Sequence, residues 1–96
     1  MLNQTVIIGR VVELLSFEKD GKKLAHLNIV VPRSEINENG EHITDLIPCQ
    51  VEGTMAENVA AYCSVGDLVG VKGRLAVIDN TLKLATEKVT FLTTKK

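Results

Sequence analysis

Hydrophobic and polar residues alternate along much of this chain, which is the pattern of β-strands that bury one face. Residues 5–15 are rich in β-branched side chains, and residues 24–33 alternate clearly. Between them, residues 19–22 contain Asp-Gly, a favoured hairpin dipeptide. The pattern therefore predicts two antiparallel strands, the second with an inward face made of Ala25, Leu27, Ile29 and Val31.

Three more strands are predicted further along the chain, at residues 45–52, 68–78 and 82–92. Residues 34–44 are polar and acidic and centre on Asn-Gly, which predicts a loop or a projecting flexible hairpin. Residues 79–81 predict a tight turn. In the strand at 45–52, the inward side chains are Ile47, Cys49 and Val51, and the outward ones are Leu46, Pro48, Gln50 and Glu52.

One short helix is predicted between the third and fourth strands. Thr54 and Glu57 match a capping box, in which the threonine hydroxyl accepts a hydrogen bond from a backbone amide and the glutamate reaches back to the cap. Gly66 is placed to end the helix in a left-handed conformation. We therefore expect a helix of about two turns that closes the core with the side chains that recur at four-residue spacing, Met55, Val59 and Cys63.

Glycines interrupt two of the predicted strands, Gly9 in the first and Gly70 and Gly73 in the fourth. Glycine weakens a strand interior and occurs there at bulges and at barrel bends. An order of three strands, one helix and two strands is the layout of an all-β OB-fold, a five-stranded Greek-key barrel with one short helix between strands three and four. We therefore expect residues 1–96 to form a single OB-fold domain, a fold that binds oligonucleotides or oligosaccharides.

Net charge and the lack of targeting signals limit the function further. The formal net charge is −1, so any binding of a polyanion must depend on where the cations lie. The chain shows no export signal and no apolar run of the roughly 20 residues that span a membrane. We therefore expect a cytoplasmic protein that makes no contact with membranes.

Catalytic and cofactor motifs are missing from the sequence. There is no Walker loop, no HExxH and no nucleophile elbow, and His26 and His42 stand apart from one another. We therefore expect no enzymatic activity, no cofactor and no metal. Cys49 and Cys63 lack CxxC spacing and are interpreted as buried free thiols. A cation site is a less favoured alternative to a solvated loop for the acidic residues Glu35, Glu38, Glu41 and Asp45.

Four segments of the chain together resemble the bacterial single-stranded DNA-binding protein family. They are MLNQTVIIGRV at the start, AHLNIVVPR in the second strand, DLIPCQVEGTMAENVAAY across the third strand and the helix, and VGDLVGVKGRL in the fourth strand. The most specific part is the block 56–62, followed at a fixed distance by the block 66–75. The resemblance covers residues 1–92. It implies an OB-fold without a cofactor that assembles into dimers and usually homotetramers. It also implies binding of single-stranded DNA during DNA replication, repair or recombination, with replication or recombination proteins as partners.

Aromatic side chains are scarce for this family, whose members stack bases on rings. Aromatics make up 3% of the chain. Phe17 matches a family aromatic, while Tyr62 and Phe91 are expected in the core. The turn at 79–81 is shorter than in the family, and the sequence ends in Lys95-Lys96 where many members carry an acidic tail. We expect weaker binding than usual, because the family's stacking positions are occupied by Leu46, Glu52 and Glu35.

The first hypothesis is therefore a single-strand binder that relies mainly on phosphate contacts. Its site residues are expected to be Arg10, Phe17, His26, Arg33, Lys72 and Arg74, with Phe17 and His26 as stacking or polar partners. The alternative is an interaction module of the primosomal type with weak nucleic-acid binding, in which Leu46 and Pro48 contact a protein. A third and weaker reading is an OB-fold that binds an oligosaccharide or RNA. The apolar strand edge at 6–8 predicts at least a dimer.

Overall fold

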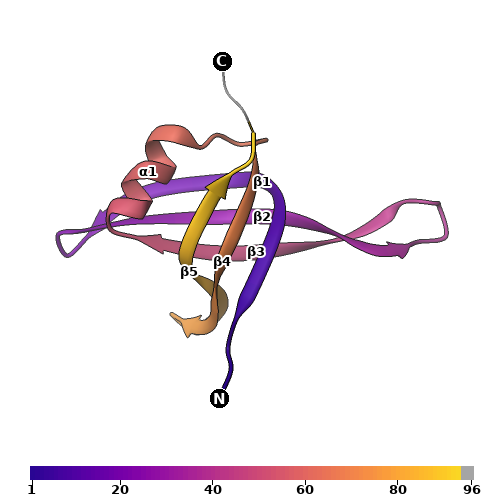
Figure 1. Ribbon diagram of the computed structural model, residues 1–96, viewed down its shortest axis with the longest axis horizontal. Helices are drawn as coiled ribbons and strands as arrows, with labels where there is room; N and C mark the ends of the chain where they lie inside the picture. Colours follow the sequence, from indigo (N-terminus) through magenta and orange to yellow (C-terminus); the bar gives the residue numbers. More distant parts are fainter. Residues whose placement is uncertain (94–96) are drawn as a thin grey trace.

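Five strands form a closed barrel, and the elements follow one another along the chain in the order that the sequence predicts (Figure 1). Residues 1–93 are described in the computed structural model; the basic tail predicted at Lys95 and Lys96 lies outside them. The strands pair in the order β1-β2-β3-β5-β4, with β4 returning to β1, so the OB-fold is confirmed. The elements are β1 (Thr5–Lys19), β2 (Lys22–Ile36), β3 (His42–Glu52), α1 (Thr54–Tyr62), β4 (Leu68–Ile78) and β5 (Thr81–Phe91).

The barrel interior is filled by aliphatic side chains from every strand, and α1 covers one end of it (Figure 1). No helix among residues 1–93 is long and apolar enough to cross a membrane. Cys49 and Cys63 are buried and form no disulfide within residues 1–93, and burial raises the pKa of Cys49 to about 12. The largest fully buried side chains are Leu27, Ile29, Leu84, Val11, Val51, Val59, Val69, Val71 and Cys49.

The second and third strands run beyond the barrel as a long hairpin, here called the β2–β3 arm (residues 32–45) (Figure 1). The segment 34–44 is therefore a projecting hairpin and not a loop. Its tip is held by Asn37, whose side-chain Oδ1 accepts hydrogen bonds from the backbone amides of Asn39 at 2.9 Å and Glu41 at 3.0 Å. Such an Asx arrangement satisfies backbone amides that the turn would otherwise leave to water.

Two irregularities in strand pairing decide which side chains face the core. In β1 the register with β2 shifts between Val11 and Glu13, so the inward positions change from odd to even numbers along the strand. In β5 the register with β4 shifts opposite Lys72 and Gly73, which leaves Glu87 as an extra residue. Leu84 and Val89 can both contact the core only because of that extra residue.

Two glycines permit close approach of neighbouring strands. A Cβ atom on Gly73 would collide with the carbonyl oxygen of Ala85, and one on Gly9 would collide with that of Val30. Close packing is therefore the reason for glycine at both positions. Gly73 also adjoins the register shift between β4 and β5, whereas the bulge in β1 lies beyond Gly9. Gly70 has no such requirement, because the nearest atom to an added Cβ lies 3.8 Å away.

The helix begins and ends differently from the prediction. Gly53 is the N-cap, with φ 69°, and no side chain caps the helix, so the capping box predicted at Thr54 and Glu57 is wrong. The positive φ turns the chain sharply at the end of β3, which makes Thr54 the first helical residue. The helix ends at Tyr62, and Cys63 is extended. Gly66 does have a positive φ, 98°, but in the turn that leads into β4.

Two aromatic residues expected in the interior lie at the surface instead. Tyr62 is 64% exposed and Phe91 39% exposed. Tyr62 falls outside the helix stripe that contacts the core, and Phe91 is the last residue of β5, where the barrel ends. These corrections leave two aromatic rings free to contact other molecules.

The close approach at Gly73 yields a stability prediction. Gly73→Ala is expected to lower the free energy of unfolding by about 1–3 kcal/mol, because the backbone of β5 must move away from the new methyl group. Gly70→Ala on the same strand is the matched control and is expected to change stability little. Urea denaturation at two protein concentrations measures both. Equal effects of the two substitutions would show that the close approach does not constrain the barrel.

Candidate nucleic-acid interface

The outer face of β1, β2 and β3 forms a strip of side chains that point away from the core. Because directly paired residues share a face, the register groups them into rows across the three strands. The rows are Leu15, His26 and Gln50; then Glu13, Asn28 and Pro48; then Arg10, Val30 and Leu46. We call these side chains the outer strip. It is mixed in character: His26 and Gln50 make one end polar, whereas the other end carries Val30 and Leu46 beside Arg10.

A ring pair lies at the polar end of the outer strip. The rings of Phe17 and His26 meet edge to face, with centroids 5.0 Å apart and an interplanar angle of 81°. His26 Nε2 is also 3.2 Å from Gln50 Oε1, and which ring nitrogen donates depends on the tautomer. Two contacts therefore fix the histidine ring, which places an oriented aromatic and polar group on the surface. The sequence predicted both Phe17 and His26 for the site, and the structure brings them together.

A groove of about 490 Å³ begins beside the outer strip, between β3 and the β4–β5 hairpin. No aromatic ring lines it, and its polar lining consists of Gln50, Glu52, Arg74, Thr86 and Glu87. Thr86 Oγ1 is buried there and makes no hydrogen bond within residues 1–93. Glu52 is paired with Lys22 at 3.0 Å. The groove therefore has both signs of charge and no stacking platform, in line with the substitutions seen in the sequence.

The four predicted cations do not gather in one channel. Arg10 belongs to the outer strip and donates a hydrogen bond from Nη1 to the Gly66 carbonyl at 3.2 Å. Arg74 lines the groove. Lys72 lies on the outer face of β4, where β1 and β5 flank it. Arg33 is on the β2–β3 arm. It is an odd number of residues from His26 along β2, so the two side chains point to opposite faces of the strand.

Arg33 is already paired with carboxylates. Its Nε and Nη2 atoms donate to the two oxygens of Asp45 at 2.9 and 2.8 Å, and Glu35 lies 3.8 Å from Nη1. The hydrogen bond from Arg33 lowers the pKa of Asp45, and the same contact raises the pKa of Arg33. The guanidinium of Arg33 is thus neutralised by carboxylates of the same acidic segment. Among residues 1–93, no group of side chains is arranged to hold a metal ion.

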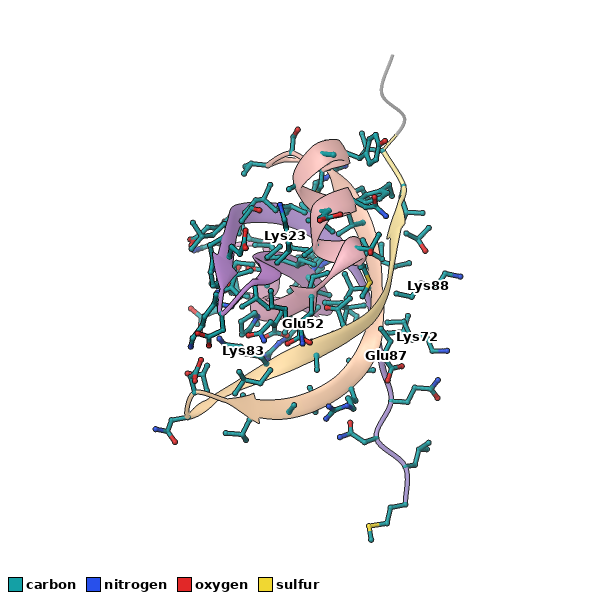
Figure 2. The ribbon with its side chains drawn as sticks, turned by 90° about the vertical axis from the view of Figure 1, so that its left-hand side faces the viewer. Lys23, Glu52, Lys72, Lys83, Glu87 and Lys88 are labelled. Atoms are coloured by element: carbon teal, nitrogen blue, oxygen red, sulfur yellow. The ribbon has the colours of Figure 1, made fainter. Side chains whose placement is uncertain are left out.

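Lys88 is a cation that the sequence reasoning missed. It is directly opposite Lys72 in the β4–β5 ladder, and both side chains point away from the barrel on the same side (Figure 2). Like charges placed directly opposite one another are destabilising unless something neutralises them. If β4 and β5 paired regularly from the turn at 79–80, Lys72 would be opposite Glu87. The bulge in β5 places Lys88 opposite Lys72 instead. The two ammonium groups together are suited to bind an anion.

A family model described as the single-strand binding protein family matches residues 2–91. Single-stranded DNA-binding protein 1 of Clostridium acetobutylicum is 40% identical over 107 positions, which cover 99% of this chain and 97% of that protein. Single-stranded DNA-binding protein B of Bacillus subtilis is 39% identical over 77 positions, which cover 78% of this chain and 68% of that protein.

Solved structures show the same fold at low sequence identity. The small single-stranded DNA-binding protein of Streptomyces coelicolor superposes with a TM-score of 0.78 at 15% identity, covering 95% of this chain and 94% of that one. The dimeric N-terminal domain of PriB from Thermoanaerobacter tencongensis gives 0.73 at 20% identity, covering 96% and 98%. These likenesses confirm the barrel architecture.

The pairing of Arg33 with Asp45 yields a pH prediction. Because the pKa of Asp45 is lowered, the ion pair is complete above the ordinary aspartate range and is lost as the pH falls through the lowered pKa. NMR titration of the Asp45 carboxyl group should give a midpoint below 3.8. Arg33→Gln should return that midpoint to the ordinary range, while Arg74→Gln should not move it. An unshifted midpoint in the unsubstituted protein would mean that the pair does not form in solution.

Proposed function

The chain belongs to the single-strand binding protein family, and from this premise we propose that it binds single-stranded DNA without sequence preference. The observation that carries the proposal is the outer strip with its ring pair, an oriented patch of aromatic and hydrogen-bonding groups on the exposed face of a barrel of this family. OB-folds use the face of strands two and three and the adjacent loops to bind oligonucleotides. The proposed path of the strand therefore begins at Phe17 and His26.

The path continues through the groove and over β4. Arg74 in the groove and Lys72 are two residues apart on one strand, about 7 Å along it, and Lys88 is beside Lys72. Cations at this spacing can follow a sugar-phosphate backbone, so we assign phosphate contacts to Lys72, Arg74 and Lys88. Arg10, at the other end of the outer strip, is a separate phosphate contact in this proposal. Arg33, predicted from the sequence, is left out because Asp45 holds its guanidinium.

Affinity on this path comes mainly from charge. Each stacked base contributes about 1–3 kcal/mol in single-strand binders, and the outer strip offers one small ring pair. The carboxylates of Glu52 and Glu87 in the groove oppose phosphates that pass near them. We therefore propose modest affinity with strong dependence on salt. Single-strand binding of this kind serves DNA replication, repair and recombination, in concert with the proteins of those processes.

Assembly of several copies follows from the open edge of β1. Residues 5–9 pair with β4, whereas β1 pairs with β2 from Arg10 onward. Val6 and Ile8 are exposed on this segment and line a largely apolar hollow of about 300 Å³ together with Leu92. Lys72 and Lys88 line the same hollow, so the proposed contact between chains adjoins the proposed phosphate site. An unpaired, apolar strand edge associates readily with another strand. We propose that two chains associate along it as a dimer and that two dimers form the homotetramer.

Salt dependence tests the proposed DNA contacts. Fluorescence anisotropy with a labelled oligo-dT should show the logarithm of affinity falling with the logarithm of salt concentration, with a slope of about −0.7 per phosphate neutralised. Lys88→Gln and Lys72→Gln should each reduce that slope by about 0.7. Arg33→Gln is the matched control and should leave it unchanged. Absence of binding at low salt would contradict the proposal and favour a module that contacts proteins.

The β1 edge gives a second test. Ile8→Asp should shift the protein towards the mass of one chain in light scattering, because the carboxylate cannot be buried without a partner. Val77→Asp, at another exposed apolar residue on the β4–β5 hairpin, should leave the assembly intact. A single-chain mass for the unsubstituted protein at micromolar concentration would rule out the proposed assembly.

A further inference from the structure

Gly70 lies inside β4, at a position where the fold does not require glycine. Its φ is not positive, and an added Cβ would have no atom nearer than 3.8 Å. It pairs regularly with Ile8 of β1 and Thr90 of β5, because the register shift between β4 and β5 falls beyond Lys72. Glycine in a strand interior often marks a bulge or the close approach of another backbone or a ligand. At Gly70 there is no bulge and no close backbone, so the approach of a ligand remains.

The missing side chain leaves a space in the outer face of the sheet. An added Cβ would lie 3.8–3.9 Å from side-chain atoms of Thr90, Ile8 and Leu92, so these three side chains surround the space. Together with Gly70 they line the hollow of about 300 Å³ beside the β1 edge. The hollow faces outward, because directly paired residues share a face and both Ile8 and Thr90 are exposed. It is apolar around Gly70, with the Thr90 hydroxyl at its side.

Two cations line the same hollow. Lys72 is two residues from Gly70, so its side chain leaves the same face of β4 about 7 Å along the strand. Lys88 is directly opposite Lys72, and both side chains point away from the barrel on the same side (Figure 2). Neither lysine forms an ion pair within residues 1–93, and no carboxylate lines the hollow. The hollow therefore joins an apolar surface to two ammonium groups that nothing neutralises.

This combination decides which occupant fits. A second copy that covered this face across a twofold axis would bring four lysines together, two from each copy, and like charges that face one another are destabilising. The association proposed along the β1 edge lies in the plane of the sheet and leaves the outer face uncovered. A nucleotide carries an anionic phosphate and an uncharged nucleoside with a flat base. Those two parts match the lysines and the apolar surface, and about 7 Å between Gly70 and Lys72 is within the reach of one nucleotide.

We propose that Gly70 is a contact position for single-stranded DNA, where the nucleoside of one nucleotide lies in the hollow and its phosphate binds between Lys72 and Lys88. Thr90, opposite Gly70, has a hydroxyl that can donate a hydrogen bond to that phosphate. The site rests on the proposed single-strand binding and extends it, because it adds a contact with base and sugar to the phosphate contacts on β4. This contact needs no aromatic ring, which suits a chain with 3% aromatic residues.

Filling the hollow tests the proposal without removing a charge. In Gly70→Val the new side chain occupies the space over β4, and stability should not fall, because the space is open and valine is favoured in strands. Affinity for oligo-dT in fluorescence anisotropy should fall roughly 5-fold or more, equivalent to ~1 kcal/mol. Ala60→Val, which adds bulk at an exposed position of α1, is the matched control and should leave affinity unchanged. Urea denaturation checks that both variants are folded.

A second measurement needs no substitution. In the methyl-labelled protein, the ring current of a base in the hollow should shift the NMR signal of the Ile8 δ1-methyl group as oligo-dT is added. The δ1-methyl group of Ile36, which is exposed on the β2–β3 arm, is the reference and should not move. An Ile8 signal that stays unmoved at saturating oligo-dT overturns the proposal, and this holds even if Gly70→Val does not fold.

The outcomes separate this proposal from the single-strand binding on which it rests. If oligo-dT binds and folded Gly70→Val binds it as tightly as the unsubstituted protein does, the site at Gly70 is overturned while single-strand binding stands. If Gly70→Val instead changes the mass in light scattering, the hollow is a contact between copies and the proposal is likewise overturned. Failure of oligo-dT to bind even at low salt overturns both proposals.

Discussion

Closure of five strands into a small barrel is the constraint on which the other features depend. Long strands must bend and still present apolar side chains to one interior, although the alternation of a strand fixes which residues face it. The chain meets this demand with a bulge in β1 and another in β5, each of which changes the inward positions from one parity to the other. Glycine at Gly9 and Gly73 lets the neighbouring backbone approach where a methyl group would collide.

The same bulge in β5 also arranges the charges. Without Glu87 as an extra residue, Lys72 would be opposite a carboxylate and the ladder would carry an ordinary surface ion pair. With it, Lys72 and Lys88 are adjacent (Figure 2), and Glu87 is one of the residues that line the groove. The protein therefore has a local positive site although its formal net charge is −1. Local placement, and not total charge, is what suits it to a polyanion.

The sequence predicted the order of elements, the barrel and the facing of most core residues, because alternation and turn residues are local signals. His26 was placed on the outward face by the same alternation, whereas Phe17 was singled out by the family resemblance. The pairing of Arg33 was missed because Asp45 lies on another strand, and the helix cap was misplaced by one residue because Gly53, not Thr54, turns the chain. The bulge in β5 did leave a signal: Leu84 and Val89 cannot both face inward on a regular strand.

The account rests on a strand of DNA lying along the outer strip and then across β4. The most direct measurement is a titration of the 15N-labelled protein with a short oligo-dT, followed through backbone amide shifts. The account predicts the largest shifts at Phe17, His26 and Gln50 and again at Lys72 and Lys88, with the tip of the β2–β3 arm unmoved. Shifts confined to that arm, or to the β4–β5 turn at 79–80, would contradict it.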